Sequence, residues 1–178
     1  MAHEAVARPG SDDEQTRYHV DTVSSLTEKA LAEYRAQLAP HEVSFEQTSG
    51  FFVLTTHGDV SAAQMEAWLA VSAAYRDDHP GEPPFLLIDI REGSGISQAA
   101  RRLVSNRAKE RPGALYMGIF GGSLATRAIF ALLVKGTSLA SRGFQLTAHM
   151  LANESEARAW LAEHRRQYLA NQSSPPSS

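Results

Sequence analysis

Three short apolar blocks, separated by segments with helical spacing, constrain the fold of this chain more than any other feature. The blocks run from Phe85 to Ile90, apart from Asp89, and from Leu115 to Phe120, and the third, from Phe144 to Met150, includes polar residues. A continuous apolar block of this length is typical of a strand that is buried on both faces. Because strands that alternate with helices form parallel sheets covered by helices, the pattern predicts an α/β fold.

Capping residues mark where the helices between and around these blocks begin. Three residue pairs have the spacing of a capping box: Ser25 with Glu28, Ser61 with Gln64, and Asn153 with Glu156. Between the first two pairs, Val43 to Gln47 alternates apolar and polar residues and Phe51 to Thr56 follows a tight turn. That arrangement predicts a β-hairpin. The chain therefore reads as a helix, a hairpin, three helix–strand units and a last helix.

The order of these elements predicts one mixed, mostly parallel sheet of five strands, with an N-terminal β-hairpin and with helices packed on the sheet. The 178 residues fit one domain with tails better than two domains. We expect a flexible tail over residues 1–22, an additional helix over 23–40, the α/β domain over 41–170 and a second tail over 171–178.

The composition excludes several classes of protein. The chain has no cysteine, which excludes disulfides, thiol nucleophiles and thiolate metal sites and suits a reducing cytoplasm. A net charge of −3 gives no reason to expect a nucleic acid as partner. No apolar run approaches the roughly 20 residues of a membrane span, and the N-terminus has no apolar signal region. These features predict a cytoplasmic protein without a transmembrane segment.

Two turns that contain glycine are the first candidates for chemistry. Gly93, Gly95 and Gln98 resemble the opening of a dinucleotide-binding loop, but glutamine replaces its third glycine and no acidic residue follows at the end of the next strand. Gly122 and Ser123 lie between a strand and a helix, as in a nucleophile elbow, but the motif is one residue short. We therefore interpret the glycines as turn residues and Ser123 as the N-cap of the following helix.

A serine hydrolase would also need a base and an acid. His149 and His164 are the only histidines after Ser123, and no aspartate follows Asp89, so a glutamate such as Glu154 would have to supply the acid. None of the seven histidines has the spacing of a paired metal ligand, although His57 and His149 each end a strand and could become neighbours. We expect neither catalysis nor a metal or cofactor.

Asp89 and a basic helix each leave two interpretations open. Asp89 lies inside an apolar run, where a carboxylate needs partners or a raised pKa. It is either a functional acid or, as we favour, a cap for the amides of a neighbouring loop. The helix after it carries a set of cations: Arg101, Arg102, Arg107, Lys109 and, just beyond, Arg111. Such a run is usually a solvated face, but it could meet an acidic partner or lipid head groups.

Four segments share a pattern with a known group of proteins. They are Gly50–Leu69, Pro84–Gly95, Ala114–Ser123 and Asn153–Arg165. Their marks are a glycine that ends a strand, an aspartate that ends a hydrophobic strand, small residues after a third strand, and a closing helix: Gly58, Asp89, Gly121 with Gly122, and Glu156, Ala157, Trp160 and Leu161. In this order they resemble the SpoIIAA-like branch of the STAS (sulfate transporter and anti-sigma factor antagonist) families, over about residues 42–165.

The resemblance implies a mixed five-strand sheet and a non-enzymatic, regulatory role in protein–protein interaction, and it allows a homodimer. Phosphorylated members carry a serine at the helix start after the central strand, where Ser94 and Ser97 lie here, but Gly93 replaces the preceding aspartate. The related SEC14-type fold implies instead a small-ligand or lipid-binding domain. Its cavity would be lined by the apolar segment from Leu124 to Leu139, although the same residues fit an ordinary core helix.

The candidate contact residues follow the carboxyl ends of the predicted strands, where α/β sheets bind their ligands. They are Asp59, Asp89, Gly93, Ser94, Gly95, Ser97, Gly122 and Ser123. Of these, the segment from Arg91 to Ser97 is predicted as a strand-to-helix loop and as the main contact point for a protein partner. The sequence does not specify that partner.

Overall fold

The computed structural model describes residues 25–110, 112–140 and 143–172. Its centre is one sheet of five strands in the order β1-β2-β3-β4-β5. The strands are β1 (Glu42–Glu46), β2 (Phe51–Val60), β3 (Phe85–Ile96), β4 (Gly113–Phe120) and β5 (Phe144–Leu151). β1 and β2 pair antiparallel, and the other three pairs are parallel. The prediction of an α/β fold with a mixed, mostly parallel sheet is confirmed.

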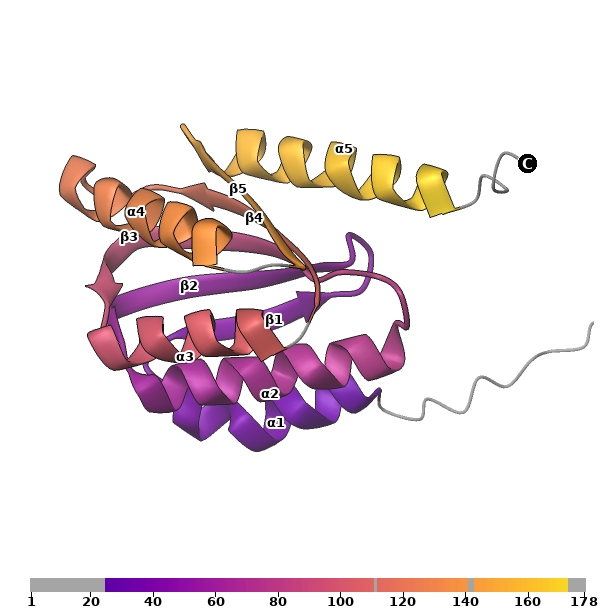
Figure 1. Ribbon diagram of the computed structural model, residues 1–178, viewed down its shortest axis with the longest axis horizontal. Helices are drawn as coiled ribbons and strands as arrows, with labels where there is room; N and C mark the ends of the chain where they lie inside the picture. The colour runs from indigo at the N-terminus through magenta and orange to yellow at the C-terminus, as the bar shows by residue number, and fades with distance from the viewer. Residues whose placement is uncertain (1–24, 111, 141–142, 173–178) are drawn as a thin grey trace, which may run out of the picture.

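Helices cover both faces of the sheet (Figure 1). They are α1 (Leu26–Leu38), α2 (Ala62–Asp78), α3 (Gln98–Glu110), α4 (Leu124–Ala140) and α5 (Glu154–Gln172). α1, α2 and α3 lie side by side on one face, whereas α5 covers the opposite face. Phe130 of α4 belongs to the core under α2, so α4 completes the layer on the α2 side. We call this side the helical layer, meaning α1 to α4.

The helix starts follow the capping signals of the sequence. Ser25 and Ser61 each accept a hydrogen bond from the backbone three residues later, and the paired Glu28 and Gln64 side chains bond back to the cap. Asn153 likewise accepts a hydrogen bond from the Glu156 amide before α5. The capping boxes at Ser25 and Ser61 are confirmed, whereas at Asn153 only the cap itself forms, because Glu156 accepts from the Ala152 amide and from the Asn153 side chain instead.

The loop predicted from Arg91 to Ser97 is wrong. β3 continues to Ile96 and pairs with β2 through Gly58 with Gly93 and Asp59 with Gly95. Pairing of β3 with β4 ends at Asp89. The extension is therefore bonded on one side only and needs no apolar block, which explains why its polar and glycine-rich sequence resembled a loop.

A hydrophobic core lies on each face of the sheet, between the sheet and the helices that pack on it. The core under the helical layer contains Phe52, Val71, Tyr75, Ile88 and Ile119, all buried. The core under α5 is smaller and is built from the following buried residues: Phe51, Phe85, Leu87, Phe120, Ala157 and Leu161. Alternate residues of β3 enter opposite cores, as a strand buried on both faces requires.

Both ends of the chain bear on the predicted domain limits. α1 occupies part of the segment 23–40 that was expected to form an additional helix. α5 extends through Gln172, two residues into the segment expected as the C-terminal tail. The predicted tail over residues 1–22, and residues 173–178 of the second tail, lie outside the described residues.

Candidate functional site

Asp89 lies at the carboxyl end of the central strand and is held by one arginine. Its side chain is buried, with the residue only 5% exposed. Its Oδ1 accepts hydrogen bonds from the Arg91 backbone amide at 2.9 Å and from Arg91 Nε at 3.1 Å, and Oδ2 meets Arg91 Nη2 at 2.5 Å. Burial raises the pKa of Asp89, but the bonds from Arg91 outweigh it and hold the pKa below its usual value. Asp89 is therefore an ionised structural carboxylate, but the amide that it accepts from belongs to Arg91 of the same strand and not to a neighbouring loop, as we had favoured.

Ser94 and Asp59 meet where β2 and β3 extend beyond the rest of the sheet. The Ser94 hydroxyl donates a hydrogen bond of 2.8 Å to Asp59 Oδ1. Gly95 lies opposite Asp59 in the ladder, and a Cβ at Gly95 would lie 3.1 Å from Asp59 Oδ1. Gly93 packs directly against the Thr56 side chain, so no larger residue fits there. The structure thus brings four of the predicted contact residues together: Asp59, Gly93, Ser94 and Gly95.

The remaining predicted residues begin helices. Ser97 caps α3 by accepting a hydrogen bond of 3.2 Å from the Ala100 amide. Ser123 caps α4 through the Thr126 amide at 3.2 Å, and its hydroxyl lies 3.0 Å from that of Thr126. Gly122 has a φ of +69°, which a side chain would strain. The hydroxyl of Ser123 is thus committed to capping, as the sequence predicted.

The side chains at this edge of the sheet mostly bind one another. Besides the two contacts above, His57 Nδ1 lies 2.8 Å from Glu92 Oε2, between β2 and β3. Within the described part of the chain, no cluster of three histidine or carboxylate side chains could hold a metal ion. A polar ligand at this edge would have to break existing hydrogen bonds, so the edge is a weak candidate for a binding site.

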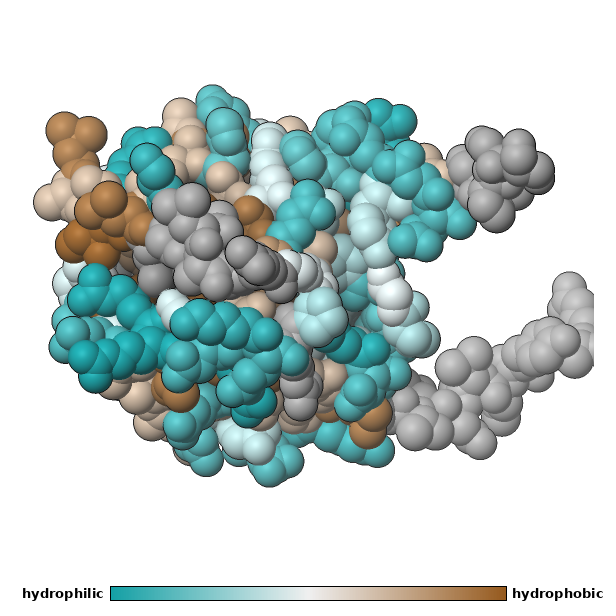
Figure 2. All heavy atoms as spheres, in the orientation of Figure 1, coloured by the Kyte–Doolittle hydropathy of each residue, from teal (hydrophilic) through white to brown (hydrophobic). Residues whose placement is uncertain are grey.

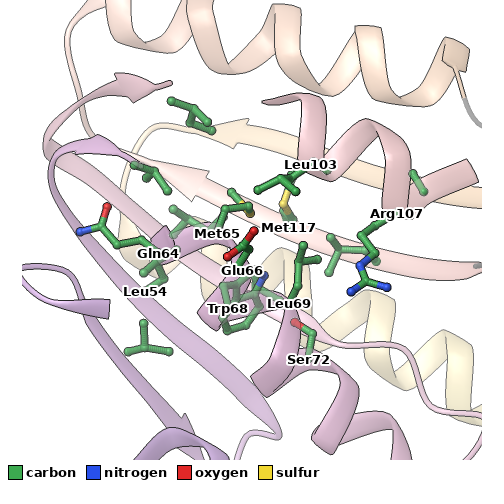
Figure 3. A pocket seen from close by; sticks show the side chains of 18 of the residues that line it. Leu54, Gln64, Met65, Glu66, Trp68, Leu69, Ser72, Leu103, Arg107 and Met117 are labelled. Atoms are coloured by element: carbon green, nitrogen blue, oxygen red, sulfur yellow. The ribbon is translucent and has the colours of Figure 1, made fainter. Parts of the chain in front are cut away.

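A cavity under the helical layer is the stronger candidate (Figure 3). It has a volume of about 460 Å³ and lies between the sheet and helices α2, α3 and α4. Its wall is mostly aliphatic and aromatic, and includes the following side chains: Leu54, Met65, Trp68, Leu69, Leu86, Ile88, Leu103, Val104, Leu115, Met117, Phe130, Val134, Phe144 and Leu146. Such a volume falls within the range of about 300–1,000 Å³ that is usual for small-molecule sites.

A few polar side chains reach the same cavity. Gln64 and Ser72 come from α2, Arg107 from α3, and Thr56 and His41 from the sheet and from the turn before β1. Figure 3 shows Gln64 and Arg107 on opposite sides of the cavity, with Met65, Leu69 and Leu103 between them. Glu66 also lies between Gln64 and Arg107 in this view. The cavity therefore combines a mostly apolar wall with a few polar side chains, an arrangement suited to a mainly apolar molecule.

The sequence pointed to the wrong residues for this cavity. Of the apolar residues of α4 expected to line it, Phe130 and Val134 do so, whereas Ile129 and Leu132 are exposed. Leu133 lies outside the side chains that the structure describes. Most of the wall comes from α2 and the sheet rather than from the segment Leu124 to Leu139. The signal was weak: small residues such as Ala70, Ser72 and Ala73 line the cavity along α2.

The comparisons with known proteins found a similar solved structure and no family. No family model matches the sequence, and no curated protein matches it. Among solved structures, an uncharacterised protein of the DUF3478 family from Shewanella loihica PV-4 is similar to this chain, with 17% sequence identity and a TM-score of 0.44. The similarity covers 68% of this chain and 91% of that chain. That protein is described as having a SpoIIAA-like fold, the fold that the sequence resemblance implied.

The helices were also compared with the length that a bilayer requires. Across the described residues, none is both long enough and apolar enough to cross a membrane. The prediction that the chain lacks a transmembrane segment therefore holds for that part of it.

Proposed function

We propose that this protein binds a small, mainly apolar molecule in the cavity under the helical layer and does not act as an enzyme. The single observation that carries the proposal is the cavity of about 460 Å³ with its apolar wall. Protein interiors are normally packed to the density of organic crystals, with few voids larger than a water molecule. An apolar space of this size loses dispersion contacts that a ligand would restore.

The edge of the sheet supports a function without catalysis. Ser123 is the only residue that the sequence placed in a nucleophile-like turn, and its hydroxyl caps α4. Asp89 is paired with Arg91 and has a lowered pKa, with burial opposed and outweighed by the hydrogen bonds from Arg91. A general acid needs a raised pKa, so Asp89 is unsuited to that role at neutral pH.

Tryptophan fluorescence tests the proposal directly, because the two tryptophans lie on opposite sides of the sheet. Trp68 lines the cavity, whereas Trp160 packs in the core under α5. In a Trp160→Phe variant, Trp68 is the only tryptophan that remains. We expect titration with methyl decanoate to change the emission of this variant in a saturable way. A Trp68→Phe variant, which keeps Trp160, should show no such change.

A filled cavity provides the matched control. Ala73 lines the cavity, and Ala63 is exposed on the same helix. Ala73→Leu should weaken binding at least about tenfold, because the added atoms occupy ligand space. Ala63→Leu should leave binding unchanged. If no apolar ligand changes the emission of Trp68, or if both leucine variants bind equally well, the proposed function is wrong.

A regulatory protein–protein interaction is the second candidate, and α4 favours it. Leu124 is 87% exposed and Leu132 is 71% exposed, and Figure 2 shows hydrophobic residues gathered where α4 lies. α4 packs beside β5, which is an edge strand of the sheet. Edge strands and apolar helix faces are surfaces through which proteins pair. We propose that the partner is a second copy of this chain in the cytoplasm, with α4 and β5 at the contact.

Sedimentation equilibrium separates this candidate from a monomer. The wild-type protein should have the mass of a dimer, and Leu132→Lys should have the mass of a monomer, because a charge would be buried in the contact. Leu169→Lys on α5, also an exposed leucine, is the control and should remain dimeric. A monomeric wild type at all accessible concentrations removes the homodimer.

A further inference from the structure

The imidazole of His41 is a buried polar group at one side of the cavity. His41 follows α1 and precedes β1, and it is only 7% exposed. Its Nδ1 lies 3.0 Å from the backbone nitrogen of His57. A backbone amide can only donate, so Nδ1 must be the acceptor and the proton of the neutral ring is on Nε2.

The Nε2 atom of His41 lacks the acceptor that this proton requires. It is the buried side-chain atom without a hydrogen-bond partner among the described residues. Buried donors almost always have a partner, and an unpaired one destabilises the fold. The ring cannot escape by changing tautomer, because Nδ1 would then lose the His57 amide. An acceptor supplied from outside the chain would satisfy this group.

The cavity is the place from which that acceptor could come. His41 lines it together with Gln64 and Thr56. Both neighbours are already bonded: Gln64 accepts from the Ser61 amide and donates to the Ala39 carbonyl, and the Thr56 hydroxyl donates to the Asp89 carbonyl. Burial, the largest effect, lowers the pKa of His41 and outweighs the Gln64 side-chain amide, which lies close enough to the ring to raise that pKa but makes no hydrogen bond of good geometry to Nε2. The ring is therefore neutral at physiological pH.

The charges near His41 favour a neutral acceptor over an anion. The adjacent His57 ring is flanked by two carboxylates, with Nδ1 at 2.8 Å from Glu92 and Nε2 at 3.7 Å from Glu42. The charged residues that line the cavity lie on α2 and α3: Glu66, Arg76 and Arg107. Within the cavity lining, the cations Arg76 and Arg107 lie on α2 and α3 rather than in the turn that holds His41, and Arg35 shares a different pocket with His41. A neutral imidazole donates well to a carbonyl or hydroxyl oxygen.

We propose that the cavity selects mainly apolar molecules that carry a neutral oxygen acceptor, such as an ester, ketone or alcohol, and that this oxygen accepts a hydrogen bond from His41 Nε2–H. The inference rests on the proposed function, because it needs an apolar ligand in the cavity. It adds the chemical class of the ligand and the residue that recognises it.

Three ligands of matched chain length test the inference: decane, methyl decanoate and decanoic acid. Each is titrated into the Trp160→Phe protein, with Trp68 emission as the signal. One net hydrogen bond should make the ester bind about three- to tenfold more tightly than the alkane. The acid, ionised at neutral pH, should bind no more tightly than the ester. The nitrogen resonance of His41 Nε2 should move with the ester and stay in place with the alkane.

Two substitutions of His41 separate its donor from its structural role. In His41→Asn, the amide oxygen can take the place of Nδ1 toward the His57 amide, while the Nε2 donor is lost. In His41→Gln, the longer side chain can place its amide nitrogen near the position of Nε2. The preference for the ester over the alkane should disappear in His41→Asn and persist in His41→Gln.

The outcomes distinguish the inference from the function on which it rests. Equal binding of the alkane and the ester by the Trp160→Phe protein overturns the role of His41 and leaves the cavity as an apolar site. An ester preference that survives in His41→Asn also overturns the role of His41. A strong preference for the acid overturns it as well, because the head group would then lie at Arg107. Failure of all three ligands to change Trp68 emission refutes the proposed function together with the inference.

Discussion

The carboxylate of Asp78 binds the first turn of α1 through Thr27. Oδ2 of Asp78 accepts hydrogen bonds from the Thr27 amide at 2.7 Å and from the Thr27 hydroxyl at 2.6 Å, and Oδ1 accepts one from the Leu26 amide at 3.1 Å. The C-terminal end of α2 therefore satisfies the free amides at the start of α1. The helix that lies outside the family resemblance is thereby fastened to the α/β body.

Asp78→Asn should destabilise the protein by about 1–2 kcal/mol. The substitution removes the charge of the carboxylate that accepts the hydrogen bonds, and the new amide nitrogen could face a donor of Thr27. Urea unfolding at neutral pH measures the loss. Asp77→Asn is the matched control, because Asp77 is next to Asp78 in the sequence and is exposed. If the two variants unfold at the same urea concentration, the contact between Asp78 and α1 does not stabilise the fold.

The ion pair between Asp89 and Arg91 predicts a dependence of stability on pH. Burial raises the pKa of Asp89, but the hydrogen bonds from Arg91 lower it further, so the folded pKa lies below the usual value of 3.8. A lowered folded pKa contributes stability that is present above the unfolded pKa and is lost as the pH falls through the folded pKa. Asp89→Asn should therefore cost about 1–2 kcal/mol at neutral pH.

Urea unfolding of wild type and Asp89→Asn over a pH series checks this prediction. The difference in the free energy of unfolding should be constant at neutral and mildly acidic pH and should shrink as the pH falls through the lowered pKa of the folded wild-type carboxyl group. A difference that grows as the pH falls would mean that Asp89 has a raised pKa. The earlier alternative, in which Asp89 is a functional acid, would then return.

Gly122 is predicted to be more sensitive to substitution than Gly58, which has a similar backbone conformation. It has a φ of +69°, and an added Cβ would lie 2.9 Å from Ile90 Cδ1 and 3.0 Å from the Ile90 carbonyl oxygen. Gly58 has a φ of +73°, but an added Cβ would meet nothing within 4 Å. Gly58→Ala should cost about 1–2 kcal/mol from the left-handed conformation alone.

Gly122→Ala should cost the same amount and a further packing penalty of about 1 kcal/mol or more. Thermal unfolding of the two alanine variants, measured side by side, gives the comparison. Equal losses would show that the turn before α4 relaxes away from Ile90.

Local signals were sufficient for most of the fold. The helix starts at Ser25, Ser61 and Asn153 were predictable because a capping box depends only on residues three apart. The buried strands from Phe85 and Leu115 were predictable because their apolar runs are continuous. The extension of β3 through Gly93 and Gly95 was missed because its order comes from β2, a partner distant in sequence, rather than from its own composition.

The cavity and its polar end could not be predicted from local pattern. His41 stands alone in the sequence, and its meaning depends on the His57 amide, which uses Nδ1 and leaves Nε2 without a partner. Likewise, Ile129 and Phe130 are adjacent and both apolar, yet one is exposed and the other is buried. Which of them faces the sheet depends on how α4 is rotated against β3 and β5.

The contact between Ser94 and Asp59 bears on whether this segment is a phosphorylation switch. The Ser94 hydroxyl donates to Asp59 Oδ1 at 2.8 Å, so a negative group on Ser94 would face a carboxylate. It would also lose the start-of-helix environment that the sequence suggested, because Ser94 lies within β3 and Ser97 caps α3. Like charges on paired strands destabilise a sheet by roughly 0.2–1 kcal/mol.

Ser94→Asp should therefore destabilise the protein by about 1 kcal/mol, through lost hydrogen bonding and repulsion together. Adding Asp59→Asn to Ser94→Asp should recover most of that loss, because the asparagine amide can donate to the new carboxylate. Ser94→Ala, which removes only the hydrogen bond, should cost less than Ser94→Asp. Denaturant unfolding of wild type, Ser94→Asp, Asp59→Asn and the double variant completes a double-mutant cycle. A coupling energy near zero between positions 59 and 94 would show that the pair is independent and that a phosphate on Ser94 could be accommodated without disturbing β2.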